Sequence, residues 1–423
     1  MAKRLFLYVE SKHMIRLLLF LLLPFLALTQ VTPLSTRLGR IIDVQGNDFI
    51  IKGVNWWGAN GSQYPYSADH SKGTDTHAMP FGLHMQEMDS VILAIKTAGF
   101  NAVRLPFSNE LLHDDTPAQV EWVGPNISLI GLTPLEVLDT VIRKLTDQGI
   151  FVILNNHSTT THWCCNYDFN GLWYGKNLYY DQTPEQWIAD WKMMAERYLN
   201  NSRVVGMDLR NEVRPLRMQH IPLPKNPNWG RKNKRDWHKY ATMVGNAIHE
   251  VNPNLLIIVE GINAQVRFLS QLKFPHLTPV QKRPIVLKVP YKLVYEVHNY
   301  SFSWSKANLL FPKRQVKYTD LTSEERREHY ERLWGFVSDS TFEHTAPVLL
   351  GEFGCSSDGS DVAPWLKDLS DYVQMKRFGF CWWTLEEELF NTGSYGIMNA
   401  EMNQVNVQND WRWEYLLPLM ELK

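Results

Sequence analysis

The chain has 423 residues, of which 44% are hydrophobic and 21% are charged. This composition excludes a disordered tail, a collagen-like repeat and a polytopic membrane protein. Lysine and arginine number 43 and aspartate and glutamate 44, so a net charge of −1 provides no general attraction to nucleic acid or to an anionic membrane. The 16 tryptophans suit surfaces on which flat, hydroxylated ligands stack.

The chain begins with a predicted targeting segment. Residues 17–28 form an apolar run that follows Lys12, His13 and Arg16, and the run is short for a bilayer span but typical of a signal peptide. We expect cleavage to remove residues 1–29 and to leave a protein that is secreted, extracellular or in a cell wall, with no stable membrane association. An uncleaved segment that anchors the protein in a membrane is the alternative.

Strand-like and helix-like patterns alternate along the rest of the chain. A hairpin signal with its turn at Gly46-Asn47 comes first. Eight continuous β-rich runs follow, at 51–57, 102–107, 151–155, 204–209, 255–260, 293–298, 348–353 and 378–384. Helical patterns lie between them, at 85–98, 134–148, 184–199, 235–251, 323–338 and 362–376, whereas residues 262–290 are too rich in proline for a helix to be placed.

The order of these elements predicts the fold. Strands that are apolar throughout and alternate with helices indicate a parallel sheet covered by helices. Eight such units predict an α/β fold, a closed (β/α)8 TIM barrel with a short N-terminal capping hairpin, as a single catalytic domain over residues 38–420. No Gly-x-Gly-x-x-Gly follows the first run, which argues against a dinucleotide-binding sheet.

Polar and aromatic residues gather at the carboxyl ends of the predicted strands, where barrel enzymes carry their sites. Because uncompensated polar groups in a partly buried cleft are costly, such a collection indicates chemistry. The set is Trp56, Trp57, Arg104, His157, Asn211, Glu212, Glu260, His298, Tyr300, Glu352 and Trp383.

Two of the carboxylates are placed for glycoside hydrolysis, which requires one protonated and one ionised carboxyl group beside the scissile bond, about 5–5.5 Å apart for retention of configuration. Strands four and seven of a barrel face each other, so Glu212 and Glu352 can oppose one another across a sugar. Glu260 lies on the strand next to Glu212, and we interpret it as a structural or supporting acid. Glu110 falls at a predicted helix start, where its charge favours the helix dipole.

At this point the sequence resembles the family 5 glycoside hydrolases, the cellulase family, over about residues 40 to 410. The resemblance rests on motifs that occur in order, namely Lys52-Gly53-Val54-Asn55, Asn101-Ala102-Val103-Arg104, His157, Leu209-Arg210-Asn211-Glu212, His298-Asn299-Tyr300, Gly351-Glu352-Phe353-Gly354 and Trp383. It implies a retaining double displacement in which Glu352 is the nucleophile and Glu212 the acid and then the base. The implied substrate is a β-linked glucan, mannan or related saccharide, with no cofactor and no metal, and we expect a monomer.

The resemblance also implies roles for the supporting residues. Arg104 and Tyr300 are the type of donors that keep Glu352 ionised. Asn211 would bond the sugar 2-hydroxyl, His298 would orient Glu212, and His157 would bond another hydroxyl. Trp383 would form the stacking floor beneath the sugar. Further sugar platforms are sought among Trp56, Trp57, Trp163 and Trp173, although loop packing is an equal alternative for Trp163 and Trp173.

The sequence departs from the family pattern at Val213, where a proline is common, and at Ser158, where an asparagine is common. Two other functions share much of the pattern. A transglycosylase that remodels cell-wall β-glycan would share every catalytic residue, and a non-catalytic carbohydrate-binding barrel would keep the tryptophans but lose a carboxylate. Endo or exo action stays open at this stage.

Cysteines and glycosylation sequons give further expectations. Three pairings of the four cysteines are open, and we expect any long-range disulfide to join Cys164 or Cys165 to Cys355, with Cys381 as a buried free thiol. Sequons begin at five asparagines. Those at Asn156 and Asn299 lie in predicted strands and are not expected to carry glycans, whereas those at Asn60, Asn126 and Asn200 are candidates.

Overall fold

The structure is a computed structural model of the whole chain. It describes residues 31–61, 77–161, 171–175, 180–214, 217–218, 221–222, 227–262, 264–267, 270–273, 276–302, 304–306, 316–386, 389–390 and 393–422. Residues 32–423 form one compact unit, to which the following account applies. The predicted signal peptide lies outside the described residues. Among the helices that are described, none is long and apolar enough to cross a membrane.

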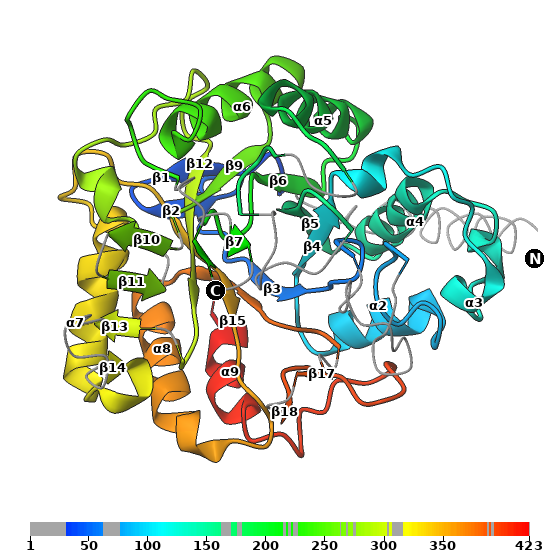
Figure 1. The fold of residues 1–423 in the computed structure, drawn as a ribbon. Coiled ribbons are helices and arrows are strands. Elements are labelled where there is room, and N and C mark those ends of the chain that lie inside the picture. The colour runs from blue at the N-terminus through cyan, green and yellow to red at the C-terminus, as the bar shows by residue number, and fades with distance from the viewer. Residues whose placement is uncertain are drawn as a thin grey trace, which may run out of the picture. The chain divides into compact units, whose positions relative to one another are not determined.

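The centre of this unit is a closed barrel of eight parallel strands (Figure 1). Their order around the barrel is β12-β15-β16-β3-β4-β5-β6-β9, which is the chain order closed into a ring. The predicted TIM barrel is therefore confirmed. The strands are β3 (Lys52–Asn55), β4 (Ala102–Ser108), β5 (Phe151–Ser158), β6 (Val204–Asp208), β9 (Leu256–Glu260), β12 (Leu293–Asn299), β15 (Val348–Phe353) and β16 (Gly379–Trp382).

Helices surround the barrel (Figure 1). They are α2 (Met88–Thr97), α3 (Val120–Val123), α4 (Pro134–Asp147), α5 (Pro184–Arg197), α6 (Trp237–Val251), α7 (Ser323–Leu333), α8 (Ala363–Lys376) and α9 (Trp413–Met420). Thr133 and Thr183 each form a capping box in front of a proline, so α4 and α5 begin where side-chain chemistry satisfies their first backbone donors.

One barrel unit differs from the others. Between β9 and β12 the described residues contain a hairpin, β10 (Ala264–Arg267) with β11 (Ser270–Lys273), and the 3-10 helix η3 (Thr278–Gln281). The segment also contains Pro275, Pro279, Pro284 and Pro290. Since proline lacks the backbone donor that a helix interior needs, this stretch does not sustain a long helix.

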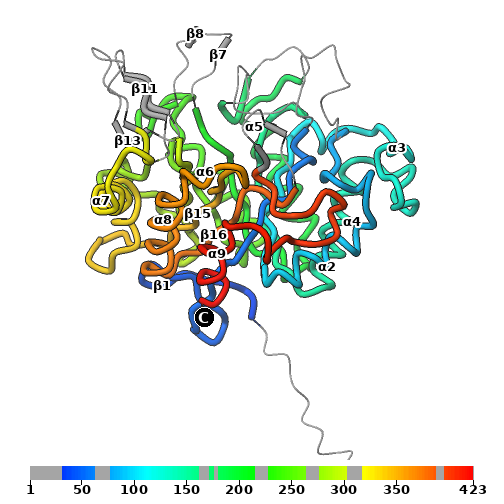
Figure 2. Tube along the Cα trace, turned by 90° about the horizontal axis from the view of Figure 1, so that it is seen from below, coloured from blue at the N-terminus to red at the C-terminus, as the bar shows by residue number. Residues whose placement is uncertain are grey.

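The capping hairpin is present, but its turn is earlier than predicted. Strands β1 (Ser35–Arg37) and β2 (Arg40–Ile42) pair around Leu38-Gly39, while the predicted turn at Gly46 belongs to the adjoining loop that an Ile42–Asp48 bridge closes. Lys292 and Tyr291, just before β12, hydrogen-bond to residues at the hairpin. The hairpin therefore covers the amino ends of the strands, near the C-terminus (Figure 2), and leaves the carboxyl ends for the site.

Candidate active site

Glu352 lies on β15 and is almost fully buried at the carboxyl end of the barrel. Arg104, on β4, donates from Nη1 to its Oε1 at 2.8 Å, and Tyr300 donates its hydroxyl to Oε2 at 3.0 Å. Burial raises the pKa of Glu352, and the charges of His298 and Arg104 oppose that rise. The two donors expected from the sequence are thus in contact with this carboxylate.

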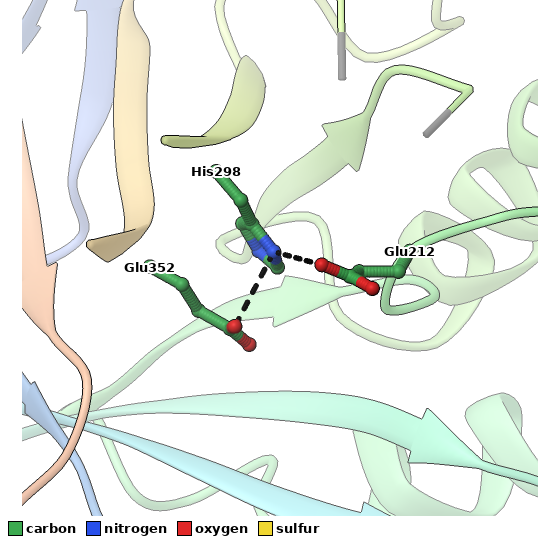
Figure 3. A group of neighbouring side chains, drawn as sticks. All are labelled: Glu212, His298 and Glu352. Carbon is green, nitrogen blue, oxygen red and sulfur yellow. Dashed lines mark hydrogen bonds and ion pairs between the residues drawn. The ribbon is translucent and has the colours of Figure 1, made fainter. Parts of the chain in front are cut away.

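Glu212 follows β6 by four residues, and its side chain is 17% exposed. Its backbone has φ +42°, in the left-handed region that a side chain other than glycine seldom adopts. One oxygen of Glu212, one oxygen of Glu352 and a ring nitrogen of His298 all lie within 4.8 Å of one another (Figure 3). The two glutamates that the sequence placed on opposite strands therefore do face each other.

His298 lies between these two carboxyl groups (Figure 3). Its Nδ1 is 3.2 Å from Glu212 Oε1 and 3.4 Å from Glu352 Oε2. Although burial acts to lower the pKa of His298, the charges of Glu260 and Glu352 outweigh it and raise that pKa well above its usual value. The imidazole is thus a cation, and its N–H can donate a hydrogen bond to either carboxylate.

Arg104 occupies the centre of the barrel and is fully buried. Besides Glu352 it contacts Asp208 through Nε at 2.8 Å and Glu296 at 3.2 Å. It also donates to Asn55 Oδ1 at 2.8 Å and to Asn211 Oδ1 at 3.0 Å. Sequence reasoning did not single out Asn55, Asp208 or Glu296 as site residues. The signal that could have found Asp208 and Glu296 is a carboxylate inside an otherwise apolar strand.

Glu296 needs the glycine at position 351. A Cβ on Gly351 would lie 1.5 Å from Glu296 Oε1, so any other residue would displace this carboxylate. The pairing of β12 with β15 also shifts at this point, and the shift brings His298 opposite Glu352. The glycine of the Gly351-Glu352 motif is therefore required by packing beneath the site.

The buried carboxyl groups cannot all be ionised. Arg104 forms ion pairs with Asp208, Glu296 and Glu352. His298 forms ion pairs with Glu212, Glu260, Glu296 and Glu352. Burial and then the charge of Glu296 raise the pKa of Asp208 well above its usual value. Burial also acts to raise the pKa of Glu296, but Arg104 and His298 outweigh it and lower that pKa. Of these two neighbours, Asp208 is therefore the one whose protonated form is favoured.

His157 and Asn211 form a second network beside Arg104. Asn155 Oδ1 lies 2.8 Å from His157 Nδ1, and Asn211 Nδ2 lies 3.4 Å from His157 Nε2. Burial and the charge of Arg104 lower the pKa of His157 well below its usual value, so the ring is neutral. Trp383 stacks on it with ring centroids 5.5 Å apart and an interplanar angle of 14°. The sugar contacts expected of these three residues stay predictions.

The aromatic platforms expected from the sequence divide into two groups. Trp57 forms a small cluster with Trp383 that Phe81, Tyr300 and Tyr395 adjoin. Trp56 and Trp173, in contrast, are fully buried members of the main core, so the prediction of Trp56 as a platform is wrong and Trp173 follows the alternative of loop packing. Trp173 packs against the buried side chains of Trp187, Trp237 and Tyr240. Trp163 lies outside the described residues.

An exposed aromatic side chain at the mouth was missed. Phe302 is 54% exposed and stacks on Tyr300 with centroids 5.1 Å apart. It follows the His298-Asn299-Tyr300 motif by two residues, which is the signal that could have found it.

The structure also bears on the expectations for the cysteines and for the glycosylation sites. Cys355 is a buried free thiol, so the disulfide expected at this residue is absent, whereas Cys381 is the buried free thiol that we expected. Cys164 and Cys165 lie outside the described residues. Asn60 and Asn126 are buried, which makes them poor glycan acceptors, and only Asn200 of the three candidate asparagines is exposed.

The site geometry also bears on metal binding. The ligand atoms of Glu212, His298 and Glu352 are close enough together to hold a metal ion. A protonated imidazole, however, has no free lone pair for a metal. Because the pKa of His298 is raised, the arrangement favours proton chemistry, and the absence of a metal stays a prediction.

The raised pKa of Asp208 gives a testable pH dependence of stability. A carboxyl group whose pKa is raised on folding stabilises the protein below its unfolded pKa of about 3.9, and this contribution is lost as the pH rises through the folded pKa. Asp208→Asn keeps a neutral group that can accept from Arg104 and donate to Glu296. We expect its free energy of unfolding in urea, relative to the unsubstituted protein, to increase from about pH 4 to pH 8.

Asp208→Ala serves as the comparison for that variant. It also lacks the titrating group, but it leaves the Arg104 and Asn155 donors without their acceptor, so we expect it to be less stable than Asp208→Asn by about 1–3 kcal/mol at every pH. A pH trend of Asp208→Asn that runs in the opposite direction would mean that Asp208 is ionised.

Known proteins share this fold and sequence. The profile of the family described as "Cellulase (glycosyl hydrolase family 5)" matches residues 57–388. An endoglucanase of Paenibacillus polymyxa is 32% identical over 374 residues, which are 85% of this chain and 81% of the relative. The major extracellular endoglucanase of Xanthomonas campestris is 34% identical over 225 residues, 53% of this chain and 40% of the relative.

Solved structures agree with this relationship. A hyperthermophilic endocellulase from the archaeon Pyrococcus horikoshii superposes with a TM-score of 0.71 at 25% identity, over 93% of this chain and 100% of that chain. A complex of the same organism's endocellulase with cellotetraose has a TM-score of 0.70 at 25% identity, over 92% of this chain and 99% of that chain. The chain therefore belongs to glycosyl hydrolase family 5 and is a glycoside hydrolase.

Proposed function

We propose that the protein cleaves internal bonds of a β-linked glucan by double displacement with retention of configuration. The observation that carries the mechanism is the pair Glu212 and Glu352, with one oxygen of each and a nitrogen of His298 within 4.8 Å of one another. Support for the substrate and for internal cleavage comes from the relatives, which are named endoglucanases, and from the cellotetraose complex.

In the first step Glu352 attacks the anomeric carbon and forms a covalent bond to the sugar, while the glycosidic carbon–oxygen bond breaks. Glu212 gives its proton to the departing oxygen, so the leaving chain departs as an alcohol. Arg104 and Tyr300 donate to the two oxygens of Glu352. These donors hold the carboxylate as an anion and aim it, although its burial favours the neutral form.

In the second step Glu212 acts as a base instead of an acid. As a carboxylate it removes a proton from a water molecule, which attacks the anomeric carbon and releases Glu352. Two inversions at one carbon restore the β configuration. Glu212 is more exposed than Glu352, at 17% against 6% of its side chain, and this difference suits a group that must exchange protons with solvent.

The protein around the reacting groups supports a bound sugar in this proposal. Trp383 supplies the stacking surface, fixed from behind by its parallel contact with His157. Asn211, whose Oδ1 accepts from Arg104, directs its amide group toward His157 and the site. A contact between this amide and a sugar 2-hydroxyl would strengthen as positive charge develops on the sugar ring.

The proposed roles of the two glutamates are separated by chemical rescue. Glu352→Ala cannot form a glycosyl-enzyme, so all turnover should be lost, and azide attack from the opposite face should give an α-glycosyl azide. Glu212→Ala should slow substrates with poor leaving groups by about 10²–10⁴-fold. An activated aryl glycoside should still form the intermediate, from which azide releases a β-glycosyl azide. NMR of the two products checks the assignment, and azides of one configuration from both variants would refute it.

Internal cleavage is measured on a soluble substituted cellulose. Endo action should lower the viscosity of the solution much faster than it releases reducing ends, since one internal cut halves a chain. The first product detected by NMR on a cello-oligosaccharide should be the β anomer. Reducing ends that rise in step with the loss of viscosity would indicate exo action, and an α anomer formed first would exclude retention. Longer products formed with an added acceptor sugar would instead identify a transglycosylase.

We also propose that residues 1–29 are a signal peptide and that residues 38–420 act as a monomeric, extracellular catalytic domain. The apolar run behind basic residues supports this, and one relative is named as extracellular. Protein recovered from the medium of a secreting host should begin near Gln30 by N-terminal sequencing. Full-length protein retained in the membrane fraction would favour the uncleaved anchor.

A further inference from the structure

Glu260 is a buried acid that the double displacement does not use. It is the last residue of β9 and is fully buried. Its main chain is fixed by the barrel and by Trp237, whose indole donates to the Glu260 carbonyl oxygen at 2.8 Å. Burying an ionisable side chain away from solvent has a large desolvation cost, so we expect a specific contact to compensate for it at this position.

That contact is with the main chain of Glu212. The backbone N–H of Glu212 donates to Glu260 Oε2 at 2.5 Å. Burial raises the pKa of Glu260 well above its usual value against the charge of His298, and a carboxyl oxygen accepts this hydrogen bond in either protonation state. Glu260 thus holds the peptide group from which the Glu212 side chain departs, and it does so from the neighbouring barrel strand.

The backbone at Glu212 needs such a support. Its φ of +42° lies in the left-handed region, where a residue with a side chain is strained. Without a partner for its N–H, the main chain could relax toward an ordinary conformation and turn the side chain away from His298 and Glu352. A displacement of about 1 Å at a reacting group can cost 10²-fold in rate.

The other oxygen of Glu260 faces the same site. Oε1 has no hydrogen-bond partner among the described residues, and it lies 3.7 Å from His298 Nδ1. His298 Nδ1 in turn lies 3.2 Å from Glu212. The carboxyl group of Glu260 is therefore oriented by its contact with Glu212 rather than by any competing hydrogen bond that the structure describes.

We propose that Glu260 is a positioning residue for general acid catalysis, acting through its hydrogen bond to the backbone N–H of Glu212. The proposal rests on the proposed function of Glu212 as the acid. The proposal assigns Glu260 no role toward the nucleophile, because Arg104 and Tyr300 are the residues that donate to Glu352.

Two substitutions separate the position of the oxygen from the ability of the group to ionise. Glu260→Gln keeps an oxygen at the same reach but cannot ionise, and we expect kcat/KM within about 5-fold of the unsubstituted enzyme on all substrates. Glu260→Asp keeps the carboxyl group but withdraws the oxygen by one methylene group. For Glu260→Asp and Glu260→Ala we expect kcat/KM to fall roughly 10- to 100-fold on substrates with poor leaving groups. On an activated aryl glycoside, which departs without a proton, both variants should stay within about 3-fold.

Glu296→Gln is the matched control. Glu296 is also fully buried, lies directly opposite Glu260 in the β9–β12 pairing, and contacts Arg104 rather than Glu212. We expect its effect on kcat/KM to be the same for good and poor leaving groups. Thermal unfolding of each variant shows whether it is folded, and Glu260→Asp keeps the test valid if Glu260→Ala does not fold.

Several outcomes would overturn the proposal. If kcat/KM of Glu260→Asp falls equally for good and poor leaving groups, the role of Glu260 is purely structural. If Glu260→Gln is impaired and Glu260→Asp is normal, the charge of Glu260 matters rather than the position of its oxygen. Glu212→Ala is measured in parallel. If kcat/KM depends on the leaving group in Glu212→Ala but not in Glu260→Asp, the inference about Glu260 is wrong and the proposed function stands. If kcat/KM of Glu212→Ala does not depend on the leaving group, the proposed function itself is refuted.

Discussion

The buried guanidinium of Arg104 is the interaction on which the site depends. It is fully buried on the barrel axis, where a lone cation would be far too costly. Its partners come from strands that are distant in the sequence, with Asp208, Glu296 and Glu352 as carboxyl groups at 2.8, 3.2 and 2.8 Å. A planar group with five donors in a fixed fork can hold all of them at once, which a lysine could not do. The positions of Glu352 and of Asn211 both follow from this arrangement.

The same cation makes the two reactive glutamates different. Glu352 receives direct hydrogen bonds from Arg104 and Tyr300 and is almost fully buried. Glu212 is more exposed, has a left-handed backbone conformation and contacts His298. Two carboxyl groups in one cleft can take opposite protonation states when their surroundings differ in this way. The division of labour in the proposed mechanism is thus a consequence of where each backbone leaves its strand.

Burial explains both the successes and the errors of prediction from sequence. The eight strands were located because each is apolar along its length, as a strand covered on both faces must be. Trp56 and Trp173 were misjudged for the same physical reason, since a large apolar side chain gains more from core packing than from a sugar-facing surface. The disulfide at Cys355 was predicted because this residue was expected at the barrel mouth near the loop after the third strand, and such proximity does not determine whether two thiols meet.

The sequence by itself determined the eight-unit barrel, the order of the motifs and the presence of Glu212 and Glu352 at strand ends, because hydrophobic period and strand position are local properties. Only the tertiary structure decided which buried acids meet. The contacts of Arg104 with both Asp208 and Glu296 and the hydrogen bond from Glu212 to Glu260 arise from barrel closure, which brings together residues far apart in the chain. The register shift at Gly351 is likewise a property of two paired strands, so no pattern within either strand reveals it.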